Sequence, residues 1–448
     1  MRGVNVCPIS RILVLLLLVL SGCSALARRD AVPVALQEEA RIPLDDLSGP
    51  VRYRVSGAAD QAALAKEFVG SWKRERAYLT TQGYRGPLPP TAFLALSGGG
   101  DQGAFGAGVL NGWTAAGNRP QFKLVTGIST GALIAPFAFL GSAYDAKLKA
   151  FYTTTSSKDV LTSRGYLAAL TSDAIADTQP LRRLLRKHVD RAVLDAIAAE
   201  YVKGRELWIA TTDLDKRQRY IWNMTRIASS RDPRAMDLFL SLMLASASIP
   251  GAFPPVLIDV EASGQKYQEM HVDGGAMAQV FVYPIGLDFD ALAHEHDAER
   301  QRALYVIRNS RLDPDWAQVE RRTLSIAGRA ISSLIHTQGV GDLYRIYLTA
   351  ERDGLDFNLA YIPASFNAPH KEEFDTAYMA CALQRRLRHG REGLPVGEDP
   401  TGLRRPPSAV VRLAALALEN PARREGARFG RDTQLRVRAR GRWSRTAV

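Results

Sequence analysis

Residues 97–103 read SGGGDQG and residues 127–131 read GISTG, and these two strings decide the fold that we expect. Each follows a short apolar run, 92–96 and 124–126, and precedes a segment that is predicted to be a helix, 105–116 and 131–139. Each string is therefore predicted to be a tight glycine turn between a strand and a helix. The first turn offers backbone N–H groups, and the second raises Ser129 on a strained elbow. Because acyl transfer needs a nucleophile and donors for the oxyanion, the pair predicts a serine hydrolase.

The rest of the chain alternates between expected strands and expected helices. Further strands are predicted at 206–213, 219–224, 304–309 and 357–362. Helices are predicted at 59–80, 105–116, 131–139, 178–199, 234–246, 321–350 and 371–388. Such alternation is typical of an α/β layered fold with a mainly parallel central sheet.

Composition divides the 448 residues into five segments. They are a signal segment at 1–22, a tether with a helical stretch at 23–90, a catalytic domain at 91–290, an α/β extension of that domain at 291–390, and a tail at 391–448. The tail holds 13 Arg, no Lys and 6 acidic residues, a net of +7 within a chain total of +12. We expect it to be weakly ordered, since it has few apolar residues to bury. No nucleic-acid motif accompanies the charge, so no nucleic-acid partner is expected.

The N-terminus is predicted to be a targeting segment. Arg2 and Arg11 supply a basic region, and residues 12–20 form an apolar core that is too short to span a bilayer, which needs about 20 residues. The core ends in LSGC at Cys23, which resembles the signal of bacterial lipoproteins, whose cysteine is lipidated. This predicts an exported lipoprotein, anchored through Cys23 in the outer membrane and facing the periplasm. The alternative is an ordinary secretory signal that happens to contain Cys23.

Cysteine and histidine usage excludes several other classes of protein. Cys7 would leave with the signal and Cys23 would carry lipid, so Cys381 has no partner for a disulfide. No Cys/His spacing of a metal site and no EF-hand loop is present in the sequence. We therefore expect no metal and no other cofactor.

The glycine loop has a second interpretation as a phosphate cradle. Gly98, Gly100 and Gly103 match the dinucleotide fingerprint GxGxxG, a pattern that is weak by itself. That fingerprint expects an acidic ribose ligand about 20 residues further on, where residues 119–122 read RPQF. The serine elbow also lies where a Rossmann unit would continue its alternation of strand and helix. Because the acidic residue is missing, an oxyanion hole is favoured.

The serine also needs a base, and two kinds of candidate exist. His271, His336 and His370 could serve in a histidine-dependent hydrolase, but none lies in a distinctive loop. Asp273 ends a predicted strand in the string 272–275 (VDGG), just before a glycine turn. As a lone residue, an aspartate there could equally be a turn cap.

Taken together, the three motifs resemble those of the patatin-like phospholipases over residues 93–284. The resemblance implies a three-layer α/β/α sandwich and a Ser–Asp dyad with no catalytic histidine, in which Ser129 is the nucleophile and Asp273 the base. It also implies an oxyanion hole formed by Gly98, Gly99 and Gly100, with motif support from Gly103, Gly127, Gly131, Gly274 and Gly275. The family often has Arg or Lys where this chain has Gln102, so head-group preference or loop anchoring could differ.

The expected function is therefore hydrolysis of carboxylic esters in phospholipids, lysophospholipids or similar acyl esters, with the membrane contacted through the lipid anchor. One rival is a serine carboxylesterase that uses a histidine base. The other is a lipoprotein that keeps this fold as a binding module without turnover.

Overall fold

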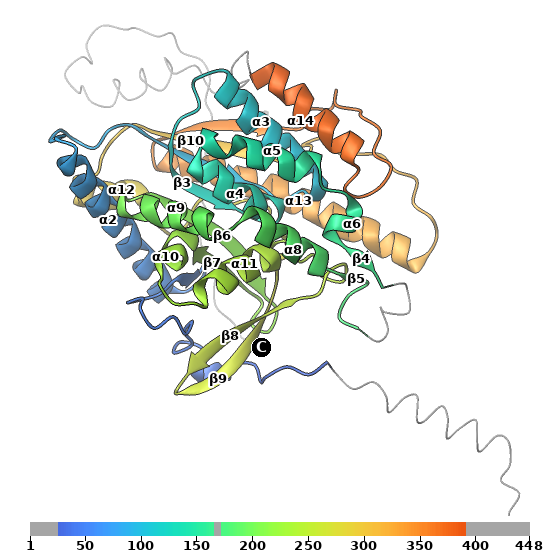
Figure 1. Ribbon diagram of the computed structural model, residues 1–448, viewed down its shortest axis with the longest axis horizontal. Helices are drawn as coiled ribbons and strands as arrows, with labels where there is room; N and C mark the ends of the chain where they lie inside the picture. The colour runs from blue at the N-terminus through green and yellow to red at the C-terminus, as the bar shows by residue number, and fades with distance from the viewer. Residues whose placement is uncertain (1–25, 165–171, 391–448) are drawn as a thin grey trace, which may run out of the picture. The chain divides into compact units, whose positions relative to one another are not determined.

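The computed structural model describes residues 26–164 and 172–390 (Figure 1). The predicted signal segment, Cys23 and the tail 391–448 lie outside the described residues. All of the described residues belong to a single compact unit.

Within the described residues, nine strands form the central sheet, in the order β1-β7-β6-β3-β2-β10-β11, with β9 paired to β6 and β8 to β9. Their bounds are β1 Arg52–Arg54, β2 Thr91–Leu96, β3 Phe122–Gly127, β6 Glu206–Asp213, β7 Gln218–Asn223, β8 Val256–Ala262, β9 Gln265–Asp273, β10 Arg302–Arg308 and β11 Leu355–Tyr361. The five central strands from β6 to β11 pair in parallel, and the pairings of β1, β7, β8 and β9 are antiparallel. A separate small sheet contains β4 Thr162–Ser163 and β5 Ala176–Asp177.

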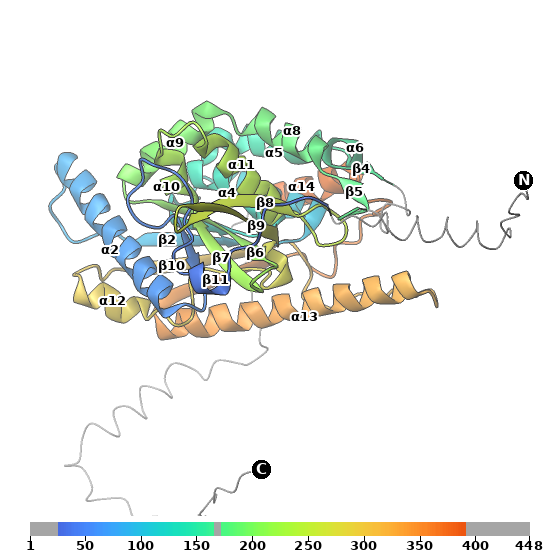
Figure 2. The same ribbon diagram turned by 90° about the horizontal axis from the view of Figure 1, so that it is seen from below.

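Helices cover both faces of the sheet (Figure 2). One face carries α3 Gly103–Ala115, α4 Thr130–Leu140, α5 Asp145–Thr153, α8 Gln179–His188, α9 Arg191–Val202, α11 Ala235–Ser246 and α14 Thr376–Gly390. The other carries α2 Ala58–Thr81, α12 Phe289–Glu295 and α13 Thr323–Arg352. The remaining helices are the short α6 Ser157–Val160 and α10 Met224–Ser229, with 3-10 turns η1 Val34–Leu36, η2 Gly100–Gln102, η3 Ser142–Tyr144 and η4 Gly274–Ala276. The predicted three-layer α/β/α architecture with a mainly parallel sheet is confirmed.

The two helical layers explain why the central strands are continuously apolar. In β2, Leu94 and Leu96 belong to the apolar cluster on the α3/α4 face, and Phe93 and Ala95 belong to the cluster on the α13 face. A parallel strand that is buried on both faces cannot show the alternation of polar and apolar residues that marks a half-exposed strand. The apolar runs before both glycine strings are therefore the expected signature of this position.

Several predicted elements differ from those observed. The single helix predicted at 178–199 is two helices, because the Asp190 side chain accepts the N–H of Val193 at 3.0 Å and starts α9. The helix predicted at 371–388 begins at Thr376. The stretch predicted as a tether contributes β1, whose Tyr53 pairs with Ile221 in the sheet. Of the hairpin formed by β8 and β9, only the end of β9 was predicted.

Among the described residues, no helix is both long enough and apolar enough to cross a bilayer.

Candidate active site

Ser129 lies on a sharp elbow between β3 and α4. Its backbone has φ 54° and ψ −127°, a strained conformation for a residue with a side chain. The two flanking glycines permit the turn. A Cβ on Gly127 would lie 2.4 Å from the Gly131 carbonyl oxygen, and one on Gly131 would lie 2.3 Å from the Leu96 carbonyl oxygen. Only glycine fits at either position, as the GxSxG pattern predicts.

Asp273 faces this serine from the end of β9. Its carboxylate forms a hydrogen bond with the Ser129 side chain, and its Oδ1 accepts the Gly275 N–H at 2.6 Å. The backbone N–H of Asp273 donates to the Ser248 carbonyl at 2.9 Å, which fixes the strand end. Asp273 therefore caps the turn η4 and contacts Ser129 at the same time.

The environment of Asp273 is that of a proton acceptor. The residue is 4% exposed. Burial raises the pKa of its carboxyl group from the ordinary 3.8 to about 7, and the hydrogen bonds from Ser129 and the Gly275 N–H offset this only in part. A carboxylate with a pKa near neutrality can take a proton from a serine during reaction and return it.

The glycine loop lies against Ser129, since a Cβ on Gly98 would be 3.3 Å from the Ser129 Cβ. Its three glycines are not equivalent. The Gly98 N–H donates to the Gln279 carbonyl at 2.9 Å and is therefore already satisfied. Gly99 (φ 150°) and Gly100 (φ 59°) have backbone conformations that favour glycine, and a Cβ on Gly99 would lie 2.0 Å from the carbonyl oxygen of Asn309.

Three backbone N–H groups near Ser129 have no hydrogen-bond partner among the described residues. They belong to Gly99, Gly100 and Thr130, the residue that follows the nucleophile candidate at the start of α4. These groups can receive an oxyanion, and the start of α4 adds positive partial charge. The structure thus removes Gly98 from the predicted set of oxyanion donors. It adds Thr130, which the sequence motifs did not indicate.

The other motif glycines allow close packing around the site. A Cβ on Gly103 would lie 2.1 Å from Thr130 Oγ1, and one on Gly274 would lie 2.6 Å from the Ala210 carbonyl oxygen. A Cβ on Gly275 would lie 2.9 Å from Asp273 Oδ1. Any side chain at these positions would displace one of the three motifs.

An apolar cavity opens from Ser129 on the α3/α4 face of the sheet. Its volume is about 30 Å³, and its lining includes Gly100 and Ser129. The other lining residues are mostly apolar: Thr130, Leu133, Phe151, Tyr152, Thr155, Val160, Leu181, Ala247, Ile249, Phe253, Phe374 and Met379. Such a lining suits a hydrocarbon chain.

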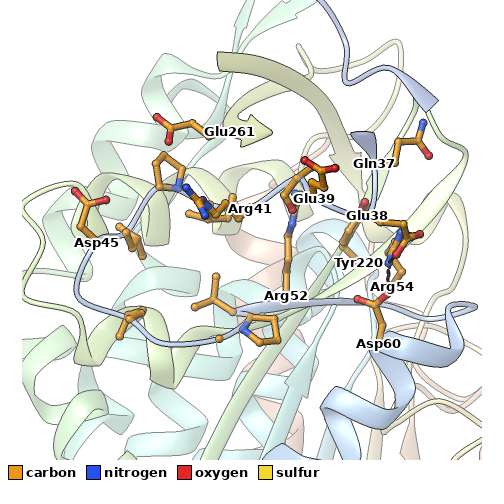
Figure 3. Close-up of a pocket in the computed structure, with 18 residues that line it drawn as sticks. Gln37, Glu38, Glu39, Arg41, Asp45, Arg52, Arg54, Asp60, Tyr220 and Glu261 are labelled. Atoms are coloured by element: carbon orange, nitrogen blue, oxygen red, sulfur yellow. Dashed lines mark hydrogen bonds and ion pairs between the residues drawn. The ribbon is translucent and has the colours of Figure 1, made fainter. Parts of the chain in front are cut away.

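A larger cavity, of about 550 Å³, lies elsewhere and contains none of the predicted site residues. It is lined by the N-terminal segment 37–54 and by Asp60, Tyr220 and Glu261 (Figure 3). Charged side chains face it, but Arg54 pairs there with both Glu38 and Asp60. The cavity thus lies between the N-terminal segment and the sheet, and its lining is polar.

Residues 94–284 match the family model described as "Patatin-like phospholipase". The chain contains a patatin-like phospholipase domain. Among solved structures, VipD from Legionella pneumophila is 11% identical, with a TM-score of 0.32 and coverage of 67% of both chains. Full-length ExoU from Pseudomonas aeruginosa, in complex with SpcU, is 16% identical, with a TM-score of 0.28 and coverage of 67% of this chain and 53% of that chain. No curated protein matches the chain.

Residues beyond the patatin-like domain complete its glycine loop. Asn309, just after β10, donates from its backbone N–H to Ser97 Oγ at 2.8 Å and from Nδ2 to the Ser97 carbonyl at 2.9 Å. Its Oδ1 accepts the Gly106 N–H at 3.0 Å. Since β10 also pairs with β2, and β11 pairs with β10, the segment after the patatin-like domain adds strands to the same sheet and supports the same site.

Gln279 joins the three parts of the site. Besides accepting from Gly98, it donates through Nε2 to the Gly275 carbonyl at 2.8 Å, and its backbone N–H donates to Asp342 Oδ2 on α13 at 2.7 Å. It therefore connects the glycine loop, the Asp273 turn and α13. No local pattern marks such a residue, because its role depends on contacts between distant segments.

Gln102, the departure from the pattern of the patatin-like family, has a structural role in this chain. Its side chain hydrogen-bonds Tyr378 on α14. The neighbouring Asp101 accepts the Phe374 N–H at 3.0 Å, and its Oδ2 lies 2.7 Å from His370 Nε2. The glycine loop is thus anchored to the segment before α14 and to α14 itself.

The candidate histidine bases do not contact Ser129 in the described structure. His370 pairs with Asp101, as above. His271 uses both ring nitrogens elsewhere: Nδ1 lies 2.8 Å from Thr211 Oγ1 and Nε2 lies 3.2 Å from Glu269 Oε2. His336 interacts through its backbone carbonyl, which accepts from Arg308 at 3.4 Å.

Asp213, Glu269 and His271 bring potential metal ligands within 4.8 Å of one another. Two cationic side chains already occupy this cluster. Lys216 pairs with Glu269 and lies 3.5 Å from Asp213, and Arg52 also pairs with Glu269. The residues therefore fit a buried ion-pair network better than a metal site.

Proposed function

We propose that the protein is a lipid acyl hydrolase that cleaves carboxylic esters of phospholipids or lysophospholipids through a Ser129–Asp273 dyad. The observation that carries this proposal is that the buried Asp273 carboxylate faces the Ser129 side chain, whose hydrogen bonding partly offsets the rise in pKa that burial causes. The patatin-like phospholipase domain over residues 94–284 supports the same reaction class.

In the proposed mechanism, Asp273 takes the hydroxyl proton as Ser129 Oγ attacks the ester carbonyl carbon. The oxygen of that carbonyl becomes negative and accepts hydrogen bonds from the N–H groups of Gly99, Gly100 and Thr130. When the tetrahedral intermediate collapses, the C–O bond to the leaving alcohol breaks and Asp273 donates its proton to that oxygen. Water then attacks the acyl-enzyme by the same route and releases the carboxylic acid.

The apolar cavity beside Ser129 supports an acyl chain as the group that is transferred. Its lining offers Leu133, Phe151, Leu181 and Phe253 but no unpaired ionic group among the described residues. At about 30 Å³ the cavity has no room for a whole alkyl chain, so its apolar lining supports the chemical class of the transferred group and not its length.

A fluorophosphonate probe tests the proposal. It should label the full-length protein, and peptide mapping should place the label on Ser129. Ser129→Ala should abolish both labelling and ester hydrolysis, whereas Ser333→Ala, which changes an exposed serine on α13, should change neither. Circular dichroism of each variant establishes that it is folded. A folded Ser129→Ala protein that keeps more than a few per cent of the activity would refute the assignment.

We also propose that the mature protein is an exported lipoprotein that begins at a lipidated Cys23. The basic residues, the short apolar core and the LSGC string support this, and several acyl chains would anchor it firmly because one chain alone binds a membrane only marginally. Mass spectrometry of the mature N-terminus tests the modification. Cys23→Ala should release the protein from the membrane fraction; equal retention would contradict the proposal.

A further inference from the structure

A second cleft lies on the α13 face of the sheet, on the side opposite the apolar cavity beside Ser129. Its volume is about 330 Å³, within the range of small-molecule sites, which begins at about 300 Å³. It lies between the start of β7, residues 280–283 and the C-terminal half of α13. We call it the α13 cleft.

One wall of the α13 cleft is apolar. Its apolar lining residues are Val55, Met277, Val280, Phe281, Val282, Ile285, Leu304, Ile346 and Ala350. Most of them belong to the apolar cluster on the α13 face, so the wall is continuous with the protein interior. Ile285 (57% exposed) and Met277 (40% exposed) bring apolar surface to the rim. A hydrocarbon chain against this wall would be removed from water, which favours its binding.

The rest of the lining carries a net positive charge. The charged lining residues are Arg217, Arg219, Asp342 and Arg345, a net of +2. Arg345 pairs with Asp342 at 2.8 Å. The Arg219 guanidinium, in contrast, forms no hydrogen bond or ion pair with another described residue. It lies over the Phe281 ring at 5.9 Å from the ring centre, near the outer limit of a cation–π contact.

The lack of a hydrogen-bonded anionic partner has an electrostatic cost for Arg219. Desolvation lowers the pKa of Arg219, and the attraction of Asp342 does not fully compensate. A planar guanidinium fits carboxylate and phosphate oxygens with two parallel hydrogen bonds. An anionic oxygen headgroup beside Arg219 would therefore satisfy a group that the protein leaves unpaired.

We propose that the α13 cleft binds a single-chain amphiphile with an anionic oxygen headgroup. The headgroup lies at Arg219, and the alkyl chain lies on the apolar wall formed by residues 280–282 and Ile346. A neutral amphiphile leaves the Arg219 charge unpaired, and a free inorganic anion leaves the apolar wall in water, so neither uses the whole cleft. The site goes beyond the proposed hydrolysis and shares no lining residue with the cavity beside Ser129.

Calorimetric titration of the full-length protein with matched ligands, all below their critical micelle concentrations, tests the ligand class. Laurate and dodecyl phosphate carry both features, inorganic phosphate and acetate carry only a headgroup, and dodecyl maltoside carries only a chain. We expect at least about tenfold tighter binding of laurate or dodecyl phosphate than of the other three. Whichever of laurate and dodecyl phosphate binds more tightly then identifies the preferred headgroup as a carboxylate or a phosphate. Equal binding of inorganic phosphate, or of dodecyl maltoside, would overturn the proposal.

Variants and mapping separate this cleft from the cavity at Ser129. Arg219→Gln should weaken binding at least about tenfold. Arg219→Lys should weaken it less, because lysine keeps the charge but lacks the two parallel N–H donors of a guanidinium. The control Arg85→Gln, which changes an exposed arginine, should have no effect. A photoreactive laurate analogue should label peptides that contain residues 277–285 or 342–350, in Ser129→Ala protein as well as in wild type. Labelling confined to other peptides, or a folded Arg219→Gln protein that binds normally, would exclude the cleft. Since mapping uses no Arg219 variant, it decides the question even if Arg219→Gln does not fold.

Discussion

Two carboxylates on strand β9, Glu269 and Asp273, are both almost fully buried, yet they have opposite properties. Asp273 has hydrogen bonds from a hydroxyl and one backbone N–H, and burial raises its pKa to about 7. Burial would also raise the pKa of Glu269, but the charge of Arg52 and the contact with His271 outweigh it and hold that pKa well below its usual range. Lys216 also pairs with Glu269.

The difference shows that burial alone does not decide what a carboxylate does. A buried acid with cationic partners stays ionised and holds segments together, whereas a buried acid with only neutral donors is available for proton transfer. Arg52 lies on β1 and Lys216 between β6 and β7, so Glu269 joins three segments. Asp273 faces only Ser129 and its own turn.

The largest expected effect concerns the base itself. Asp273→Asn keeps the size and the capping oxygen of the side chain but removes proton acceptance. We expect a loss of about 10³-fold or more in kcat/KM, in line with the removal of one member of a catalytic triad. Slower labelling of Ser129 by the fluorophosphonate probe should accompany it. Unchanged labelling kinetics would show that another group activates Ser129.

The corresponding change at Glu269, the carboxylate with cationic partners, should lower the free energy of unfolding. Glu269→Gln leaves Arg52 and Lys216 buried with less negative charge, and removal of one partner from a buried pair costs about 3–5 kcal/mol. Because the pKa of Glu269 is lowered in the folded state, its contribution is present above its ordinary pKa of 4.5 and diminishes as the pH falls below it. Urea unfolding at pH 8 and pH 3 measures both quantities. An equal deficit at the two pH values would contradict the ionic explanation.

Asp273→Asn should have the opposite effect on stability. The unfolded chain releases the Asp273 proton near pH 3.8 and the folded protein near pH 7, so this group makes folding less favourable as the pH rises between these values. The upper limit of this penalty is about 4 kcal/mol at pH 8. The variant should therefore be more stable than wild type at pH 8 and equal to it near pH 4. Thermal unfolding at both pH values checks this, and a destabilised variant at pH 8 would count against a raised pKa.

The same pKa should govern activity. Because hydrolysis requires ionised Asp273, kcat/KM on a soluble short-chain ester should rise as the pH increases through about 7 and then reach a plateau. Glu269→Gln, assayed where it is still folded, should leave this midpoint nearly unchanged. A wild-type profile that is flat between pH 5 and pH 8 would exclude Asp273 as the titrating base.

The sequence revealed one of these two carboxylates and not the other, for a physical reason. Asp273 lies in a local pattern, a strand end followed by two glycines, and local patterns predict turns. Glu269 acquires its role from Arg52, which is 217 positions away in the chain. Contacts of that kind leave no mark on the residues nearby.

The same distinction applies across the site. The Ser129 elbow, the glycine loop and most of the strands were predictable, because each depends on a few neighbouring residues. Asn309, Gln279 and Asp342 support the loop through partners in other segments, and none of them was singled out. The prediction of Gly98 as an oxyanion donor illustrates the limit, since only the fold shows that its N–H is taken by Gln279.

The smallest expected effect on catalysis concerns His271, which contacts Glu269 and lies two residues from Asp273 on β9. If Asp273 is the base, His271→Asn should lower kcat/KM by less than about threefold, since its ring nitrogens face Thr211 and Glu269 rather than Ser129. Stability should fall by about 1–3 kcal/mol, because the change leaves buried polar groups poorly satisfied. Probe labelling of Ser129, measured at a temperature where the variant is folded, separates the two effects. A loss of labelling as large as that of Asp273→Asn would transfer the role of base to the histidine and remove the distinction between the two carboxylates.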